Sequence, residues 1–296
     1  MNILKIDKCP LCGGNHFEEV MTCTDHYASG ESFQICRCKD CGFQFTHPVP
    51  VEAEIGRYYE TPDYISHSDT HKGLMNRVYH WVRRVMLARK ARLVKHNSRL
   101  SQGSLLDIGT GTGYFPHFMQ ERGWHVSAIE KSPQARQFAK EHFDVAAPEA
   151  LNEFADKSFD VITLWHVMEH LEHLNETWET LKRILKDQGI LIIAVPNPTS
   201  FDAEKYKEMW GAYDVPRHLW HFSPSVMQQF GAKHDFILCE RHPMPFDAFY
   251  VSMLSEKYRK SAFPFIKGLI TGAEAWIVSL AKKDRSSSMI YVFRKK

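Results

Sequence analysis

The chain has little cysteine after its first forty-one residues and lacks a long apolar run. No segment offers about 18 uninterrupted apolar residues, so we expect no membrane-spanning helix. The first ten residues lack the apolar core of a signal peptide, and we therefore expect a cytoplasmic location. Hydrophobic residues make up 44% and charged residues 24% of the 296. This balance is typical of a globular chain and excludes a mainly disordered or fibrous one.

Six of the seven cysteines precede residue 42. An odd number of cysteines, crowded at one end of a chain without a secretion signal, indicates metal binding rather than disulfides. Residues 9–13 and 38–42 share the pattern Cys-x-x-Cys-Gly, in which a tight turn directs two sulfurs to one ion. We therefore predict a zinc ribbon over residues 1–47 with a closed, structural tetrahedral site. Its expected ligands are Cys9, Cys12, Cys38 and Cys41. One alternative is that these cysteines are buried without a metal, and another is that Cys23, Cys36 or His16 replaces one of them as a ligand.

Acidic residues are absent between Thr70 and Leu106, where nine basic residues occur. Apolar residues recur there at helical spacing, at Leu74, Val78, Trp81, Val85 and Ala88. We predict an amphipathic helix that packs this stripe on the core and exposes its cationic face. The alternative is that the cationic face attracts an anionic acceptor or RNA. An aromatic linker precedes this helix, with Tyr58, Tyr59, Tyr64 and His67, and it either packs against the core or folds over a cofactor. The linker and the helix together make up the region 48–100.

Residues 101–241 alternate between short apolar segments and helical patterns. The pattern predicts an α/β fold with a mainly parallel sheet and helices on both faces. Expected strands are 104–108, 125–129, 159–164, 189–195, 236–241 and 289–293, with a weak additional strand near 143–146.

The loop after the first of these strands carries Gly109, Gly111 and Gly113. A dinucleotide fingerprint requires Gly-x-Gly-x-x-Gly, and this spacing does not provide it. Asp107, near the end of the first strand, would repel a pyrophosphate and attract a cationic amino-acid ligand. Glu130, just after the second strand, is placed to accept both hydroxyls of a ribose. The loop therefore favours a cationic nucleoside over a dinucleotide.

Four segments together resemble the class I S-adenosylmethionine-dependent methyltransferases: 105–115, 159–173, 185–198 and 216–224. The last of them, PRHLWHFSP, is similar to a branch whose members often carry an N-terminal cysteine ribbon. The resemblance implies a Rossmann-like, seven-stranded methyltransferase sheet whose last strand is antiparallel. It also implies a cofactor site formed by Asp107, Gly109, Thr110, Gly111 and Gly113 at the methionine part, Glu130 at the ribose, and Leu164 and His166 near the methionine or methyl.

Three histidines are candidates for catalysis: His166, His218 and His221. His166 begins the string H-x-x-E-H with Glu169 and His170. We reject an inverted zincin motif because the string follows a buried strand directly and no third ligand is identifiable. His218 and His221 precede a helix start at Ser223 and are candidate bases or acceptor contacts. The alternatives are that His166 caps the strand end and that the other two brace a lid.

Residues 242–285 are expected to form two helices that cover the substrate, and residues 286–296 the last core strand. The resulting prediction is an enzyme that transfers a methyl group from S-adenosylmethionine to a small molecule, at oxygen first and at carbon second. The apolar cover and the cationic helix suit an acceptor that is partly apolar and partly anionic. The alternatives are an RNA-binding or RNA-modifying methyltransferase and a non-catalytic cofactor-binding protein. Nucleic acid is not the expected partner because the basic residues lie in one helical stretch, and the oligomeric state is left open.

Overall fold

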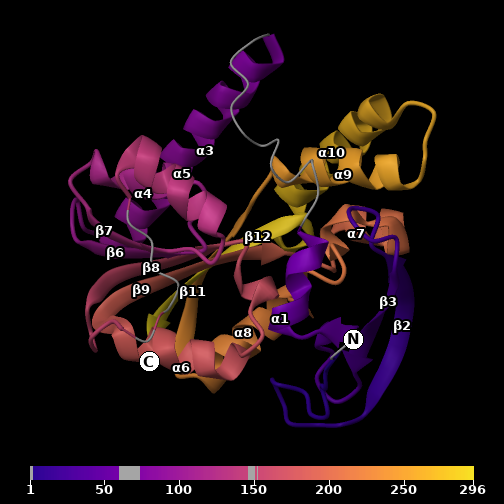
Figure 1. The fold of residues 1–296 in the computed structure, drawn as a ribbon, viewed down its shortest axis with the longest axis horizontal. Helices are drawn as coiled ribbons and strands as arrows, with labels where there is room; N and C mark the ends of the chain where they lie inside the picture. The colour runs from indigo at the N-terminus through magenta and orange to yellow at the C-terminus, as the bar shows by residue number, and fades with distance from the viewer. Residues whose placement is uncertain (1–2, 60–73, 146–150, 152) are drawn as a thin grey trace.

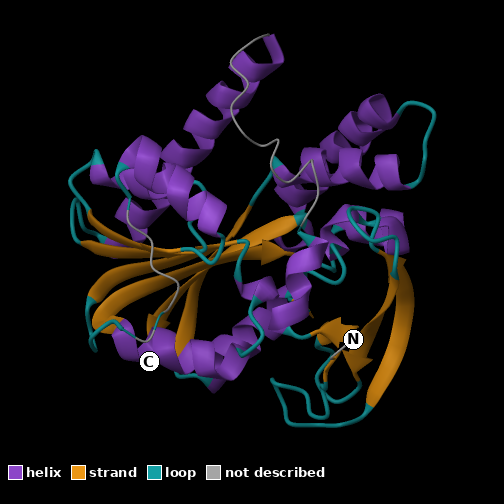
Figure 2. Ribbon diagram, viewed as in Figure 1, coloured by secondary structure: helices purple, strands orange, loops and turns teal. Residues whose placement is uncertain are grey.

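The computed structural model describes residues 3–59, 74–145, 151 and 153–296. Its main sheet has six strands in these residues, in the order β11, β12, β9, β8, β6, β7 (Figures 1 and 2). Five strands run in one direction, and β12 alone of the six runs antiparallel to both of its neighbours, β9 and β11. The bounds are β6 (Ser104–Ile108), β7 (His125–Ile129), β8 (Phe159–Trp165), β9 (Leu185–Pro196), β11 (Phe236–Pro243) and β12 (Ser288–Lys295).

This arrangement confirms the Rossmann-like class and the antiparallel strand at the chain's end. The seventh strand, expected near Phe143, is not seen in the described residues. Phe143 instead ends helix α5, and the next two residues, Asp144 and Val145, belong to no strand. Ala146 lies outside the described residues.

Helices cover both faces of the sheet, with α3, α4 and α5 on one and α6 and α8 on the other (Figure 1). Ser132 and Ser223 cap α5 and α8, since each hydroxyl accepts a hydrogen bond from a backbone N–H three residues later. Strands β8 and β9 alternate their side chains between the two faces, so both faces have an apolar core. The bounds are α3 (Leu74–Ser98), α4 (Tyr114–Gln120), α5 (Pro133–Phe143), α6 (Leu174–Ile184) and α8 (Pro224–Lys233).

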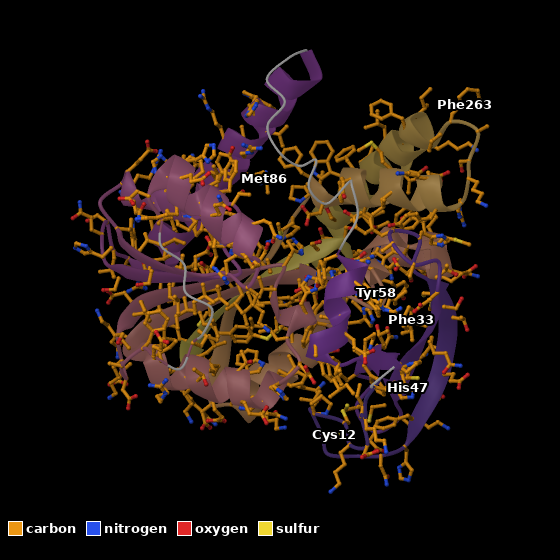
Figure 3. All side chains as sticks on the ribbon, in the orientation of Figure 1. Cys12, Phe33, His47, Tyr58, Met86 and Phe263 are labelled. Atoms are coloured by element: carbon orange, nitrogen blue, oxygen red, sulfur yellow. The ribbon has the colours of Figure 1, made fainter. Side chains whose placement is uncertain are left out.

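Helix α3 packs through a different face from the one predicted. Trp81, expected in the core, is 62% exposed. The core-facing positions are instead Met86 (Figure 3), Leu87, Ala91 and the fully buried Val94. Lys90 lies on the same face, with its ammonium 4.3 Å from the centre of the Trp165 ring. The prediction failed because a lysine stem can cover apolar surface, whereas a hydrophobic pattern counts lysine as polar.

The ribbon is a four-stranded sheet, but the chain's first forty-seven residues supply only three of the strands. These are β2 (Phe17–Thr24), β3 (Ser32–Cys38) and β4 (Gln44–His47). The fourth, β10 (Trp220–His221), comes from the segment after the core's central strands and pairs with β4. Beside this sheet, β1 (Ile3–Leu4) pairs with β5 (Val49–Pro50). The ribbon is therefore joined to the core through shared strand pairing.

Helices α9 (Asp247–Tyr258) and α10 (Pro264–Ala281) form a hairpin between β11 and β12, where two covering helices were expected. They pack closely: a Cβ on Gly268 would lie 2.5 Å from the Cα of Met253. Phe263 lies at the hairpin's tip and points away from the core (Figure 3). Among the described helices, none is both long enough and apolar enough to cross a membrane. The remaining elements are α1 (Glu52–Ile55), η1 (Gly56–Tyr58), η2 (Met168–His170), α7 (Phe201–Tyr206), η3 (Lys207–Met209), η4 (Gly211–Tyr213) and η5 (Lys283–Arg285).

Candidate cofactor site and zinc centre

The four predicted zinc ligands converge at one end of the ribbon, near the labelled Cys12 (Figure 3). Their sulfurs all lie within 4.8 Å of one another. The Sγ atoms of Cys9 and Cys41 are 3.5 Å apart, and so are those of Cys12 and Cys38. Zinc–sulfur bonds of about 2.3 Å in a tetrahedron place sulfurs roughly 3.8 Å apart, so the donor set fits a zinc ion.

The two knuckles have the same backbone. Gly13 and Gly42 each have φ of +78° and each donates an N–H, over 2.8 Å, to the carbonyl of the knuckle's first cysteine. Only glycine adopts this left-handed conformation without strain. Burial raises the pKa of the Cys9 thiol to about 11. A cation bound by the thiolates would offset that cost.

The glycine loop lies between β6 and α4, with φ of +67° at Gly109, +57° at Gly111 and +81° at Gly113. The N–H groups of Gly109 and Thr110 donate to the carbonyl of Ile129, which ties the loop to β7. The N–H of Gly111 donates to the Glu130 carboxylate over 2.7 Å. The two sequence features, glycines and acid, thus meet at the carboxyl ends of adjacent parallel strands.

Asp107 is 2% exposed and accepts a hydrogen bond of 2.6 Å from the Thr163 hydroxyl. Burial raises the pKa of Asp107 to about 6, although Thr163 and the charge of Lys90 act in the opposite direction. Burial also lowers the pKa of Lys90 to about 8. The sequence predicts Lys90 on a solvated cationic face, whereas in the structure its charge acts on the buried Asp107 carboxylate.

His166 follows β8 directly and has φ of +58°, an uncommon conformation for a residue other than glycine. Its Nε2 lies 3.1 Å from the Asp247 carboxylate and its Nδ1 lies 3.4 Å from that of Glu169. Burial alone would lower the pKa of His166, but the neighbouring Asp247 and Glu169 carboxylates raise it to about 10. His166 is therefore held as a cation. Leu164, by contrast, is fully buried in the core of the sheet.

The other two candidate histidines lie in different surroundings. His221 is 4% exposed, belongs to β10, and its Nε2 is 3.0 Å from the Thr46 hydroxyl of the ribbon. Burial lowers the pKa of His221 to about 3. His218 instead packs edge-on against His170, with ring centres 4.6 Å apart. The structure thus places His218 beside the His166–His170 string and holds His221 in the ribbon's sheet.

Two further groups lie near this string, Asp247, which local sequence does not indicate, and the linker residue Tyr59. Asp247 begins α9, eighty-one residues after its partner His166, and no short motif links them. The hydroxyl of Tyr59 lies 3.2 Å from Nδ1 of His170, which places this linker tyrosine beside the candidate site. Of the other aromatic candidates in the linker, Tyr58 is fully buried, and Tyr64 and His67 lie outside the described residues.

Comparison with known proteins gives a family match described as "Methyltransferase domain" over residues 78–239. The chain is 32% identical over 111 residues to an uncharacterized methyltransferase of Alkaliphilus oremlandii. This match covers 36% of the chain and 50% of the relative. The chain is also 34% identical over 104 residues to a ubiquinone biosynthesis O-methyltransferase of Pelagibacter ubique. That match covers 32% of the chain and 42% of the relative. The chain thus spans about half the length of the curated relatives it matches.

Among solved structures, the chain resembles geranyl diphosphate C-methyltransferase of Streptomyces coelicolor A3(2), determined with S-adenosyl-L-homocysteine. The TM-score is 0.51 with 13% sequence identity, and the match covers 77% of this chain and 88% of the other. At this identity the likeness concerns the fold, which it confirms as the Rossmann-like arrangement expected from the sequence.

Proposed function

Since the chain belongs to the methyltransferase domain family, we propose that it transfers a methyl group from S-adenosylmethionine to a small-molecule acceptor, at oxygen in preference to carbon. The observation that carries this proposal is the glycine loop with carboxylates on both sides. A cationic amino-acid part suits Asp107, and a ribose suits Glu130, whose oxygens already accept N–H hydrogen bonds from Gly111 and Ser132. When bound, the cofactor supplies an electrophilic methyl group on a sulfonium.

The loop has room for a ligand where the proposal requires it. A Cβ built on Gly111 meets nothing within 4 Å, whereas a Cβ on Gly109 would lie 2.3 Å from the Val167 side chain. Gly109 therefore serves the packing of the loop, and Gly111 leaves open space at its tip. In the proposed site, Asp107, Gly109, Thr110, Gly111 and Gly113 hold the methionine part and Glu130 holds the ribose. Lys90, an ammonium beside Asp107, would bind the methionine carboxylate.

The acceptor would be held by His166. An imidazolium fixed between Asp247 and Glu169 carries a positive charge that would stabilise a neighbouring oxyanion. An acceptor that arrives as an anion through its own acidity needs no separate general base, and its oxygen only has to be aligned with the methyl group. We therefore favour an acidic hydroxyl or a carboxylate, which agrees with the O-methyltransferase named among the relatives. His221 would have a structural role because it lies in the ribbon's sheet.

The hairpin of α9 and α10 would cover the apolar part of the acceptor, since Asp247 at the start of α9 reaches His166. Phe246, the residue before α9, lies 5.7 Å from the Arg89 guanidinium of α3. The start of the hairpin and α3 therefore approach each other beside the candidate site. The zinc ion of the ribbon would stabilise the fold and take no part in the transfer, because four thiolates leave no open position.

Calorimetry on the purified protein tests the cofactor assignment. S-adenosylmethionine and S-adenosylhomocysteine should bind to the wild type, and Glu130→Gln should bind both at least tenfold more weakly. The matched control Glu141→Gln alters an exposed acid on α5 and should bind as the wild type does. Incubation with methyl-labelled cofactor and a metabolite extract should then label a small acidic molecule. Binding of NADH without binding of either sulfur nucleoside would overturn the proposal.

A further inference from the structure

We propose that Glu169, His170 and His218 form a second metal site, for a first-row divalent cation such as Zn²⁺. The sequence alone identifies no third ligand to accompany Glu169 and His170. The fold supplies one, since a ligand atom of His218 lies within 4.8 Å of those of the other two residues.

The Glu169 carboxylate is the first reason to place a cation here. It is 1% exposed, and neither of its oxygens makes a hydrogen bond to any described residue. Nδ1 of His166 lies 3.4 Å from one of these oxygens, and the same imidazole also pairs with Asp247 through Nε2. A buried carboxylate without hydrogen bonds is costly to keep charged. A bound cation would remove that cost.

The orientation of the two imidazoles is the second, independent reason. Nδ1 of His170 lies 2.9 Å from the carbonyl oxygen of Arg217, and Nδ1 of His218 lies 2.9 Å from that of Ala212. A carbonyl only accepts, so each Nδ1 carries the hydrogen and each neutral ring keeps its lone pair on Nε2. Metal-binding histidines are characteristically held in this way, by a second-shell carbonyl on the other nitrogen.

The site is also built before any ion binds. Glu169 and His170 lie in η2 after β8, whereas His218 lies two residues before β10. The backbone joins these segments directly, because the N–H of Leu219 donates to the carbonyl of Glu169 over 2.8 Å. A cation would therefore find three donors already assembled.

Two nitrogens and one carboxylate oxygen form a donor set that suits zinc and other first-row divalent ions. The four thiolates of the ribbon form a softer set, so the two sites differ in the spectra of a bound probe ion. The proposal does not depend on methyl transfer, because occupancy can be measured without an acceptor. Its failure and the failure of the proposed function can thus be distinguished.

The test is metal stoichiometry by mass spectrometry after loading the full chain with Zn²⁺ and removing excess ion. The wild type should hold two zinc ions per chain, and His218→Asn and Glu169→Gln should each hold one. His142→Asn, which changes an exposed histidine on α5, should still hold two. One zinc per chain in the wild type would overturn the proposal, and so would two in His218→Asn. Circular dichroism checks that each variant is folded, and either variant alone decides the outcome if the other does not fold.

Co²⁺ provides a second readout on the same proteins. In the wild type, Co²⁺ should add both an intense thiolate charge-transfer band from the ribbon and weaker visible bands from the nitrogen–oxygen site. His218→Asn should lose the weaker bands and keep the thiolate band. Identical spectra in the wild type and His218→Asn would contradict the second site.

Discussion

The candidate metal centre of the ribbon and the candidate cofactor edge of the main sheet are assembled in opposite ways. The four cysteines come from two short motifs with the same backbone turn, so each motif builds its half of the centre alone. The cofactor edge takes Lys90 from α3, Asp107 from β6, His166 after β8 and Asp247 from α9. A site built from short motifs can be predicted from the sequence. A site whose residues come from several distant elements cannot, because only the tertiary structure brings its buried charges together.

The two regions are joined by one segment, residues 216–222, which runs from the candidate site into the ribbon's sheet. Its Arg217 is 3% exposed and donates to Asp25 of the ribbon over 3.1 Å, to Asp214 over 2.6 Å, and to the carbonyl of Tyr58 over 2.8 Å. Next to it, the Thr46 hydroxyl of the ribbon donates to the carbonyl of His218 over 2.6 Å. Damage to the ribbon should therefore reach the candidate site through this segment.

The largest effect should follow from loss of the ribbon's predicted zinc ligands. The double variant Cys38→Ser, Cys41→Ser removes half of the donor set, and we expect a loss on the order of 5 kcal/mol or more in the free energy of unfolding. Urea denaturation followed by tryptophan fluorescence measures it. Cys239→Ser, at an exposed cysteine outside the ribbon, is the control and should unfold as the wild type does. Equal stability of the two proteins would show that the ribbon needs no metal.

The second largest effect should come from the link between the regions. Arg217→Met leaves the Asp25 and Asp214 carboxylates without their buried cation, which should cost about 3–5 kcal/mol. Arg37→Met breaks the exposed pair with Glu18, 3.5 Å apart, and should cost less than about 1 kcal/mol. Similar losses in both variants would contradict a buried, stabilising link.

The pH dependence of Arg217→Met gives a further check. Burial would raise the pKa of both Asp25 and Asp214, yet the pKa of each is lowered. The pKa of Asp25 is lowered by a hydrogen bond from Ser29 and by the charge of Arg217. The pKa of Asp214 is lowered by a hydrogen bond from Arg217 and by the charge of His218. Lowered carboxylate pKa values stabilise the fold above about pH 4, and this stability is lost as pH falls through the folded values. The difference between wild type and Arg217→Met should therefore shrink in acid.

The third effect has the opposite sign and concerns the cofactor edge. Burial raises the pKa of Asp107 to about 6, so the wild type loses stability as pH rises from about 4 to 6. Asp107→Asn removes this penalty and should raise the free energy of unfolding at pH 8 by roughly 2–3 kcal/mol, with little change at pH 4. Its affinity for S-adenosylmethionine should fall at least tenfold. The control Asp144→Asn, at an exposed acid, should change neither the free energy of unfolding nor the affinity for S-adenosylmethionine. If Asp107→Asn were less stable than the wild type at pH 8, the Asp107 carboxylate would support the fold.

Much of the fold was predictable because its signals are local. The bounds of β6 and β7 match the prediction, and α8 is capped at the predicted start, Ser223. The expected strand near Phe143 did not appear in the described residues, since the α5 helix continues to that residue. The local pattern was also insufficient for α3. Hydrophobicity predicts a buried Trp81 and an exposed Lys90, whereas Trp81 is exposed and Lys90 faces the core.

The candidate site was predictable only in part. The glycine loop, Asp107 and Glu130 do meet at one edge, because parallel strands bring their carboxyl ends together. Asp247, however, is paired with a histidine eighty-one residues away, and His218 meets Glu169 only because β10 joins the ribbon. Such pairings depend on tertiary structure, and neither spacing nor composition indicates them.

The smallest effect should separate backbone strain from ligand space within the glycine loop. Gly111→Ala and Gly113→Ala both place a Cβ at positive φ, which costs about 1–2 kcal/mol. A Cβ on Gly113 would also lie 2.8 Å from that of Ala139, whereas one on Gly111 meets only open space. Gly113→Ala should thus lose more thermal stability, and Gly111→Ala should lose more affinity for S-adenosylhomocysteine in calorimetry. If Gly111→Ala bound the nucleoside as tightly as the wild type, the open space at the loop's tip would not be where the ligand lies.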